Sequence, residues 1–454
     1  MRPNHVMQAL DLQSVPDTLR LRGVGTGLTG QVEVPGDKSI SHRAVLLGAV
    51  AQGTTRIHNF LPANDCLATV EAVRALGAQV QFDLGSGSDR EVLVHGQGLR
   101  GMREPVRPIE CGGSGTTMRL LAGVLAGQPF YSVLAGNAQL SARPMDRVAV
   151  PLRLMGAKVL GRQHGKYPPL TIMGGGLRAI TYELPVASAQ LKSAVLLAGL
   201  YAEGVTKVIE PVPTRDHTER ILTAMGVQVE RSGAEVTIRP PDRLEPLDIR
   251  VPGDISSAAF LLTAAAILPG SRLTVMSVGV NPGRVGFLHA LGRMGARITL
   301  SNRRILHGEP VADVHIEHTP LKGICVPPQE VPGMIDELPV LAVAATQAEG
   351  TTEVRGAGEL RVKETDRIAT TAQELAKMGA CIEALPDGWR VQGPTTLHGA
   401  HVSSCGDHRL AMALTVAALC AQGETVVQGT ACAGDSFPGF YSVLHNLLGD
   451  AFDV

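Results

Sequence analysis

The sequence is poor in aromatic residues and has no excess of either charge. Aromatic residues make up 3% of the 454 residues, and 41 Lys and Arg nearly balance 42 Asp and Glu. Proteins that bind nucleic acid need basic surface and, for single strands, aromatic side chains on which bases stack. Because both are scarce here, we expect no nucleic-acid partner.

Signals for membranes, metals and nucleotide cofactors are also missing. The longest nearly apolar run, residues 258–268, is too short to span a bilayer, and the N-terminal stretch lacks the hydrophobic core of a signal peptide. Seven cysteines form no C-x-x-C pair, which predicts a reduced, cytoplasmic setting. His315 and His318 lie in an alternating stretch that would point them to opposite faces of a strand, so we expect no metal. Without a P-loop or dinucleotide fingerprint, we predict no cofactor.

The chain is instead rich in glycine, with 52 residues, and many glycines close apolar helices at regular intervals. Glycine directly after a helix is typical of a left-handed cap that turns the chain into a strand. Two such helices recur in six units of about 75 residues (454/6). The first helix of each unit ends at Gly53, Gly127, Gly204, Gly270, Gly350 and Gly423, and the second ends at Gly77, Gly156, Gly226, Gly295, Gly379 and, in a degenerate form, Gly449.

One motif divides the six units into two halves. The frame Val-Pro-Gly-Asp-x-Ser at residues 34–39 returns at residues 251–256. We therefore predict an α/β protein with two homologous halves of three units each. The predicted boundaries are 37–251 for the first half, 20–36 plus 252–454 for the second half, and 1–19 for an N-terminal extension.

The two copies of this motif differ in charge. The first copy carries Lys38 and Arg43 where the second has Ile255 and Phe260. The first turn of a helix offers unpaired N–H groups and the positive end of the helix dipole. Cations added to that position predict a site for an anion, with phosphate as the obvious ligand.

Other predicted helix starts also carry cations, although cations there oppose the helix dipole. Together with Lys38 and Arg43, these cations exceed what one phosphate requires, which predicts two anionic ligands. The acids Asp336 and Glu364 are available for proton transfer. Residues 111–119 fit either a phosphate loop or a tight turn, and Ser188 fits either a helix cap or a ligand contact. The cations concerned are Arg143, Lys363, Arg367 and Arg409.

Five ordered motifs, at residues 35–43, 114–119, 143–145, 361–367 and 407–409, resemble those of the 5-enolpyruvylshikimate-3-phosphate synthase family. The resemblance covers nearly the whole chain. It implies two similar domains, each of three βαβαββ units, with an active site in the cleft between them. It also implies transfer of the enolpyruvyl group of phosphoenolpyruvate to the 5-hydroxyl of shikimate 3-phosphate, with release of phosphate, and we expect a monomer.

The resemblance also implies roles for individual residues. Asp336 would accept the proton of the 5-hydroxyl, Glu364 would donate one to the methylene carbon, and Lys38 would support the developing charge. The implied contacts to shikimate 3-phosphate are Lys38, Ser39, Arg43, Ser188, Gln190, Asp336 and Lys363. Those to phosphoenolpyruvate are Lys38, Gly115, Arg143, Gln190, Arg367 and Arg409.

Three positions depart from the family pattern, namely Gly113, Ala189 and Asp435. Asp435 stands where some members place a lysine that binds phosphoenolpyruvate, and an acid cannot replace that contact. The sequence leaves two alternatives open. One is the related transferase that acts on UDP-N-acetylglucosamine, and the other is a noncatalytic protein that binds phosphorylated metabolites.

Overall fold

The computed structural model describes residues 16–83 and 91–452, so part of the predicted N-terminal extension lies outside it. By their contacts, the described residues form two units. The first comprises Gly36–Val251 and the short segment Ile305–Glu309. The second comprises the strands that precede Gly36, then Pro252–Arg304 and the chain from Pro310 onward.

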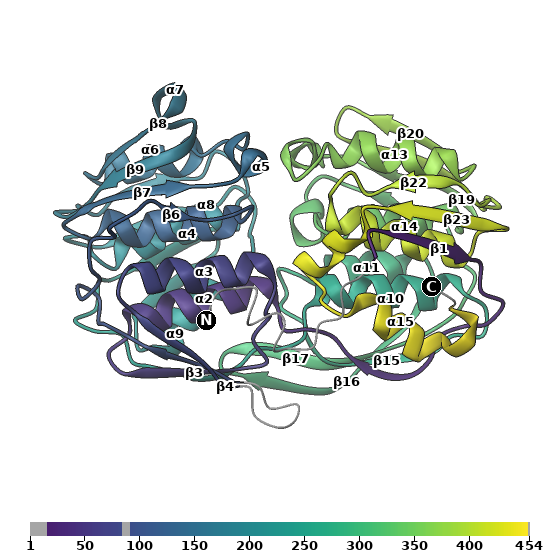
Figure 1. The fold of residues 1–454 in the computed structure, drawn as a ribbon, viewed down its shortest axis with the longest axis horizontal. Helices are drawn as coiled ribbons and strands as arrows, with labels where there is room; N and C mark the ends of the chain where they lie inside the picture. Colours follow the sequence, from purple (N-terminus) through teal and green to yellow (C-terminus); the bar gives the residue numbers. More distant parts are fainter. Residues whose placement is uncertain (1–15, 84–90, 453–454) are drawn as a thin grey trace. The chain divides into compact units, whose positions relative to one another are not determined.

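A common plan underlies both units (Figure 1). In the described residues, five of the six repeats have a leading strand, a helix, a second strand parallel to the first, a second helix and an antiparallel hairpin. This is a mixed α/β fold built from βαβαββ repeats. In the sixth repeat the strand Thr18–Arg22 pairs antiparallel with the second strand and completes the sheet.

In the first unit, three four-stranded sheets have the orders β14-β3-β5-β4, β6-β7-β9-β8 and β10-β11-β13-β12. The elements of the first repeat are β14 (Asp248–Arg250), α2 (Lys38–Val50), β3 (Thr54–His58), α3 (Asn64–Ala75), β4 (Gln79–Asp83) and β5 (Glu91–His95). Those of the second are β6 (Ile109–Glu110), α4 (Gly115–Ala126), β7 (Tyr131–Ala135), α5 (Ala138–Ser141), α6 (Asp146–Leu154), β8 (Lys158–Gly161), α7 (Arg162–Gly165) and β9 (Tyr167–Met173). Those of the third are β10 (Thr181–Glu183), α8 (Ala189–Gly199), β11 (Thr206–Ile209), α9 (His217–Ala224), β12 (Val229–Ser232) and β13 (Glu235–Ile238).

In the second unit, the sheets have the orders β16-β17-β15-β2, β18-β19-β21-β20 and β1-β23-β22. The fourth repeat contains β2 (Thr29–Glu33), α10 (Ile255–Ile267), β15 (Arg272–Gly279), α11 (Gly286–Arg293), β16 (Arg297–Leu306) and β17 (Glu309–Glu317). The fifth contains β18 (Cys325–Val326), η1 (Val331–Gly333), α12 (Leu338–Thr346), β19 (Gly350–Val354), η2 (Gly358–Val362), α13 (Arg367–Lys377), β20 (Cys381–Leu385) and β21 (Gly388–Gly393). The sixth contains β22 (His401–Ser403), α14 (His408–Leu419), β23 (Glu424–Gln428), η3 (Thr430–Asp435), α15 (Phe440–Leu448), η4 (Gly449–Ala451) and β1 (Thr18–Arg22).

The first and fourth repeats exchange their leading strands. The strand β2, which precedes α2 in the chain, pairs in parallel with β15 of the second unit. The strand β14, which precedes α10, pairs in parallel with β3 of the first unit. The chain therefore passes from one unit to the other at each copy of the Val-Pro-Gly-Asp motif.

The first helix of each repeat forms the core of its unit. Within the first unit α4 packs against both α8 and α2, and within the second unit α10, α12 and α14 pack against one another. Figure 1 shows α2, α4 and α8 of the first unit, and α10 and α14 of the second unit, between the sheets of their own unit. They are buried over almost their whole length because nearly all their side chains are apolar or small.

The predicted glycine caps are confirmed after the second helices, where five glycines directly follow the helix cap with a positive φ, namely Gly77, Gly156, Gly226, Gly295 and Gly379, and Gly449 caps α15 with a φ of +57°. After the first helices, five of the predicted glycines also have a positive φ, but they lie two to four residues beyond the helix cap and do not cap the helix, namely Gly53, Gly204, Gly270, Gly350 and Gly423. Gly127 does cap α4, but its φ is −85°. A Cβ atom at Gly127 would lie 2.1 Å from Cγ of Tyr201, so glycine is needed there for close packing and not for a left-handed turn. Among the described helices, none combines the length and the apolar character needed to cross a bilayer.

Candidate active site

The start of α2 holds the first predicted cation. Asp37 caps the helix by accepting a hydrogen bond from the backbone N–H of Ile40 at 2.9 Å. Lys38 Nζ lies 2.5 Å from Oδ2 of Asp65 on α3, and the lysine side chain is 16% exposed. The carboxylate of Asp65 offsets the unfavourable position of Lys38 at the positive end of the helix dipole.

Arg43, one turn further along α2, is buried and its orientation is fixed. Its guanidinium donates to Thr218 Oγ1 at 2.7 Å, Ser193 Oγ at 2.8 Å and the carbonyl oxygen of Ser39 at 2.9 Å. Burial lowers the pKa of Arg43 to about 10, with Glu219 opposing the shift. The side chain therefore stays charged near neutral pH.

The starts of α4 and α8 lie together. Gln190 at the start of α8 donates to Thr116 Oγ1 at 2.9 Å, and its Oε1 accepts from Arg119 of α4 at 2.6 Å. A Cβ atom at Gly115 would lie 2.8 Å from Nη1 of Arg119 and 3.2 Å from Nη1 of Arg143. Two guanidinium groups thus cover a glycine in the first turn of α4, where backbone N–H groups are available to an anion.

The predicted hydroxyl groups occupy the same helix starts. Ser188 caps α8, because its Oγ accepts a hydrogen bond from the backbone N–H of Leu191 at 3.3 Å. The predicted role of Ser188 as a helix cap is therefore confirmed. Its O–H remains a donor in chemical terms, because capping uses only the oxygen lone pair. Ser39 lies in the first turn of α2 and is half-buried. In the first unit, Gln190 therefore connects the starts of α8 and α4, and Arg43 connects α2 to α8 through Ser193.

The second unit has a corresponding cluster of acids and cations. Asp336 Oδ1 lies 3.7 Å from Nζ of Lys363 and 3.6 Å from Nη1 of Arg367. Glu364 Oε2 accepts from Nη2 of Arg367 at 2.7 Å. The two predicted proton-transfer residues, Asp336 and Glu364, are thus held by the same guanidinium group.

Arg367 is anchored by a third carboxylate. Its Nε lies 2.7 Å from Oδ2 of Asp407, which also caps α14 by accepting from the N–H of Arg409 at 2.9 Å. Burial alone would lower the pKa of Arg367, but Asp407, Glu364 and Asp336 raise it above its ordinary value. Likewise burial would raise the pKa of Asp407, but the charge of Arg367 brings it below the ordinary value. The pair is ionised over the physiological pH range.

Sequence reasoning missed a buried network beside Asp336. Arg284 Nη2 donates to Ser256 Oγ at 2.6 Å and to Asp254 Oδ1 at 3.1 Å, and Ser256 donates to the carboxylate of Glu337. Burial raises the pKa of Glu337, while Arg284 and Arg409 oppose that shift. Ser256 belongs to the second copy of the repeated motif, which lacks the two cations, so that copy supports the start of α12.

The predicted cations were visible in the sequence, but most of their partners were not. Asp65, Ser193 and Thr218 are ordinary helix residues in the sequence, and no spacing rule connects them to Lys38 or Arg43. Arg119 is an exception, because it lies four positions after Gly115 on the same helix. Residues at that spacing share a helix face, so this contact could have been predicted.

The chain is similar to known proteins over most of its length. The family model described as EPSP synthase (3-phosphoshikimate 1-carboxyvinyltransferase) matches residues 24–444. A protein named 3-phosphoshikimate 1-carboxyvinyltransferase from Pelotomaculum thermopropionicum is 54% identical over 430 residues, covering 94% of this chain and 98% of its own length. One of the same name from Desulforudis audaxviator is 51% identical over 422 residues, covering 93% and 97%.

Solved structures give the same result. An EPSP synthase from Acinetobacter baumannii is 44% identical with a TM-score of 0.84, and the match covers 95% of this chain and 98% of that one. The enolpyruvyl transferase NikO from Streptomyces tendae is 21% identical with a TM-score of 0.77, covering 96% and 98%. The second likeness concerns the fold alone.

Proposed function

The chain belongs to the EPSP synthase family, and we propose that the helix starts described above transfer the enolpyruvyl group of phosphoenolpyruvate to the 5-hydroxyl of shikimate 3-phosphate. Phosphate is released in this reaction. The observation that carries the proposal is that cations gather at helix N-termini within each unit, and that in the second unit two acids, Asp336 and Glu364, contact one of these cations, Arg367. Two anionic substrates require the cations, and proton transfer requires the acids.

Shikimate 3-phosphate is proposed to bind residues from both units. Lys38 and Arg43 supply charge, and Ser39, Ser188 and Gln190 supply hydrogen bonds in the first unit. Lys363 and Asp336 would contact the same substrate from the second unit. The short distance between Lys363 and Asp336 supports a shared role for that pair.

Phosphoenolpyruvate is proposed to bind at Gly115, where the guanidinium groups of Arg143 and Arg119 lie over the helix start. Gln190 and Lys38 would assist there, with Arg367 and Arg409 contributing from the second unit. Planar guanidinium groups match the geometry of carboxylate and phosphate oxygens. A helix N-terminus adds backbone donors for the departing phosphate.

We assign proton transfer to two carboxylates. An ionised carboxylate can accept a proton, and the cations beside Asp336 stabilise that form, so Asp336 would take the proton of the 5-hydroxyl. Glu364 would donate a proton to the methylene carbon. Its bond to Arg367 would weaken when a substrate anion takes over an N–H group of that arginine, which would prepare Glu364 to carry a proton.

The proposal is tested by following phosphate release with shikimate 3-phosphate and phosphoenolpyruvate. UDP-N-acetylglucosamine in place of the shikimate ester is the control and should give no release. Lys38→Met and Asp336→Ala should each reduce kcat at least about 100-fold, because each removes a group in direct contact with reacting atoms. Both variants should keep the circular dichroism spectrum of the wild type. Folded wild-type protein that releases no phosphate from the shikimate ester would contradict the proposal.

We further propose that the enzyme acts as a monomer in the cytoplasm. The seven cysteines, all in the thiol form in the structure, are consistent with a reducing compartment. Light scattering during size-exclusion chromatography should give the mass of one chain, and a mass of two chains would contradict the monomer.

A further inference from the structure

Arg43 of the first repeat is held by two hydroxyl groups of the third repeat. Ser193 lies on α8 and Thr218 in the first turn of α9, and both are about 1% exposed. Their oxygens lie 2.7 Å apart, and each accepts a hydrogen bond from the Arg43 guanidinium. Ser193 in turn donates to the carbonyl oxygen of Ala189 at 2.7 Å. The position of Arg43 is therefore set by how α8 and α9 pack.

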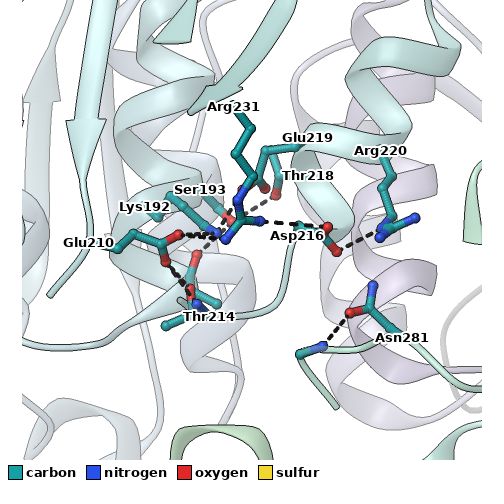
Figure 2. Close-up of polar contacts among 12 residues, drawn as sticks. Lys192, Ser193, Glu210, Thr214, Asp216, Thr218, Glu219, Arg220, Arg231 and Asn281 are labelled. Atoms are coloured by element: carbon teal, nitrogen blue, oxygen red, sulfur yellow. Dashed lines mark hydrogen bonds and ion pairs between the residues drawn. The ribbon is translucent and has the colours of Figure 1, made fainter. Parts of the chain in front are cut away.

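Charged residues next to these hydroxyls connect the same two helices (Figure 2). Lys192, the neighbour of Ser193, has a fully buried side chain whose Nζ lies 2.7 Å from Oε1 of Glu219, the neighbour of Thr218. The same Nζ lies 3.1 Å from Oε2 of Glu210, at the end of β11. Figure 2 shows Lys192 and Glu219 approaching each other beside Ser193 and Thr218.

The buried charges also extend to Arg43. Lys192 contributes one positive charge to the cluster, whereas Glu210 and Glu219 contribute two negative charges. Glu219 acts on Arg43 as well, since it raises the arginine pKa against the effect of burial. A buried charge is costly without a partner, so the four side chains stabilise one another as a group.

A guanidinium group has five N–H donors in one plane, and three of those of Arg43 donate within the protein. Fixing three donors also fixes the direction of the other two. A cation that is already oriented loses little side-chain entropy when it binds an anion.

We propose that Thr218 and Ser193 are positioning residues that aim Arg43 at shikimate 3-phosphate, and that the Lys192–Glu219 pair holds these hydroxyls in place. The inference rests on the proposed function, because it takes Arg43 as a ligand of the shikimate ester. The hydroxyls would affect binding of that substrate and leave phosphoenolpyruvate binding unchanged, because Arg43 is assigned to the first substrate only.

The first test is Thr218→Val, which keeps the shape of the side chain and removes the acceptor. The KM for shikimate 3-phosphate should rise about tenfold or more, as expected for loss of a hydrogen bond to a charged group. The KM for phosphoenolpyruvate and kcat should change less than about threefold, because uniform binding energy is lost. Thr218→Ser, which restores the oxygen, should return KM to near the wild-type value.

The matched control is Thr223→Val on the exposed face of the same helix, which should leave both KM values unchanged. An unchanged KM for shikimate 3-phosphate in Thr218→Val would overturn the inference. So would an equal rise in both KM values, or a Thr218→Ser variant as impaired as the valine variant, because each indicates a general structural effect.

A second variant and a binding measurement keep the inference testable if Thr218→Val does not fold. Ser193→Ala removes the other acceptor, and calorimetry with shikimate 3-phosphate alone measures binding without turnover. Binding about tenfold weaker than wild type supports the inference, and equal binding refutes it. A wild-type protein that binds the ester but releases no phosphate would instead refute the proposed function, so the two failures are distinguishable.

Discussion

His42 is buried at the start of α2 and provides a direct test of the electrostatics of the first unit. Its Nδ1 lies 2.7 Å from Thr69 Oγ1, and Thr69 lies 2.7 Å from Thr117 Oγ1 on α4. Within the described residues, its Nε2 is buried and has no hydrogen-bond partner. Burial lowers the pKa of His42 to about 3, Asp65 opposes this shift, and Lys38 and Arg43 add to it.

The lowered pKa predicts how stability depends on pH. In the unfolded chain, His42 takes up a proton below about pH 6.5, whereas in the folded protein it stays neutral down to about pH 3. Between these values the unfolded state binds more protons, so stability falls as pH falls. Each pH unit in this window costs about 1.4 kcal/mol, and lowering the pH from about 6.5 to about 4.5 therefore costs about 3 kcal/mol.

We propose to measure this cost by comparing the wild type with His42→Asn, whose amide can still bind Thr69. The free energy of unfolding in urea would be measured near pH 7.5 and pH 4.5 by far-ultraviolet circular dichroism. The contacts that the variant loses lower its free energy of unfolding equally at both pH values, so the change in this free energy between the two pH values is compared. On acidification, the free energy of unfolding of the wild type should fall by about 3 kcal/mol more than that of the variant. Equal losses, or a His42 titration near pH 6.5 by NMR, would refute the reasoning.

Two further predictions concern the second unit, where fluorescence of Trp389, the chain's single tryptophan, reports unfolding. Arg367→Met leaves three carboxylates without their shared cation and should destabilise this unit by about 3 to 5 kcal/mol. The control, Arg293→Ala, removes only a surface ion pair and should hardly change the urea midpoint of unfolding. Gly295→Ala forces an alanine to a φ of +101° and should destabilise the second unit by about 1 kcal/mol. Gly292 lies inside α11 with open space around it, so Gly292→Ala should stabilise the same unit by about 0.5 to 1 kcal/mol. A smaller effect at Arg367 than at Arg293, or effects of the same sign at both glycines, would contradict these predictions.

The repeated architecture was predictable because it depends on local signals. A glycine that directly follows an apolar helix favours a left-handed turn, and Gly77 and Gly295, which follow the caps of α3 and α11, have φ of +97° and +101°. The signal failed at Gly127 because two different requirements select glycine. One is backbone conformation, which is local, and the other is the proximity of Tyr201, which comes from a later repeat and cannot be inferred from neighbouring residues.

The cations of the site were predictable because they contradict a local rule. Arg367 stands at the first position of α13, where a cation opposes the helix dipole, so another reason for it was needed. Their partners obey local rules and gave no such signal. Thr218 is 175 residues from Arg43 in the chain, and only the packing of α9 brings them together.

The repeated Val-Pro-Gly-Asp motif has two roles, and the structure separates them. The frame itself is structural in both copies, because Asp37 and Asp254 each cap the helix that follows. The glycines allow close packing, since a Cβ atom at Gly36 would lie 2.0 Å from the carbonyl oxygen of Asn59, and one at Gly253 would lie 2.9 Å from Cγ2 of Val34.

Both copies of this frame stand where the chain changes units, after a strand that joins the sheet of the other half. At both places the chain must turn tightly and begin a buried helix with a capping residue, and this requirement does not depend on whether the helix start binds a substrate. The charges added to the first copy are therefore not part of the structural requirement. In the second copy, Ser256 binds Glu337 and Asp254 binds Arg284, so polar residues there support the neighbouring acid cluster from within the protein. The two copies therefore differ in charge at the helix start, whereas they share the frame because each crossing between units requires it.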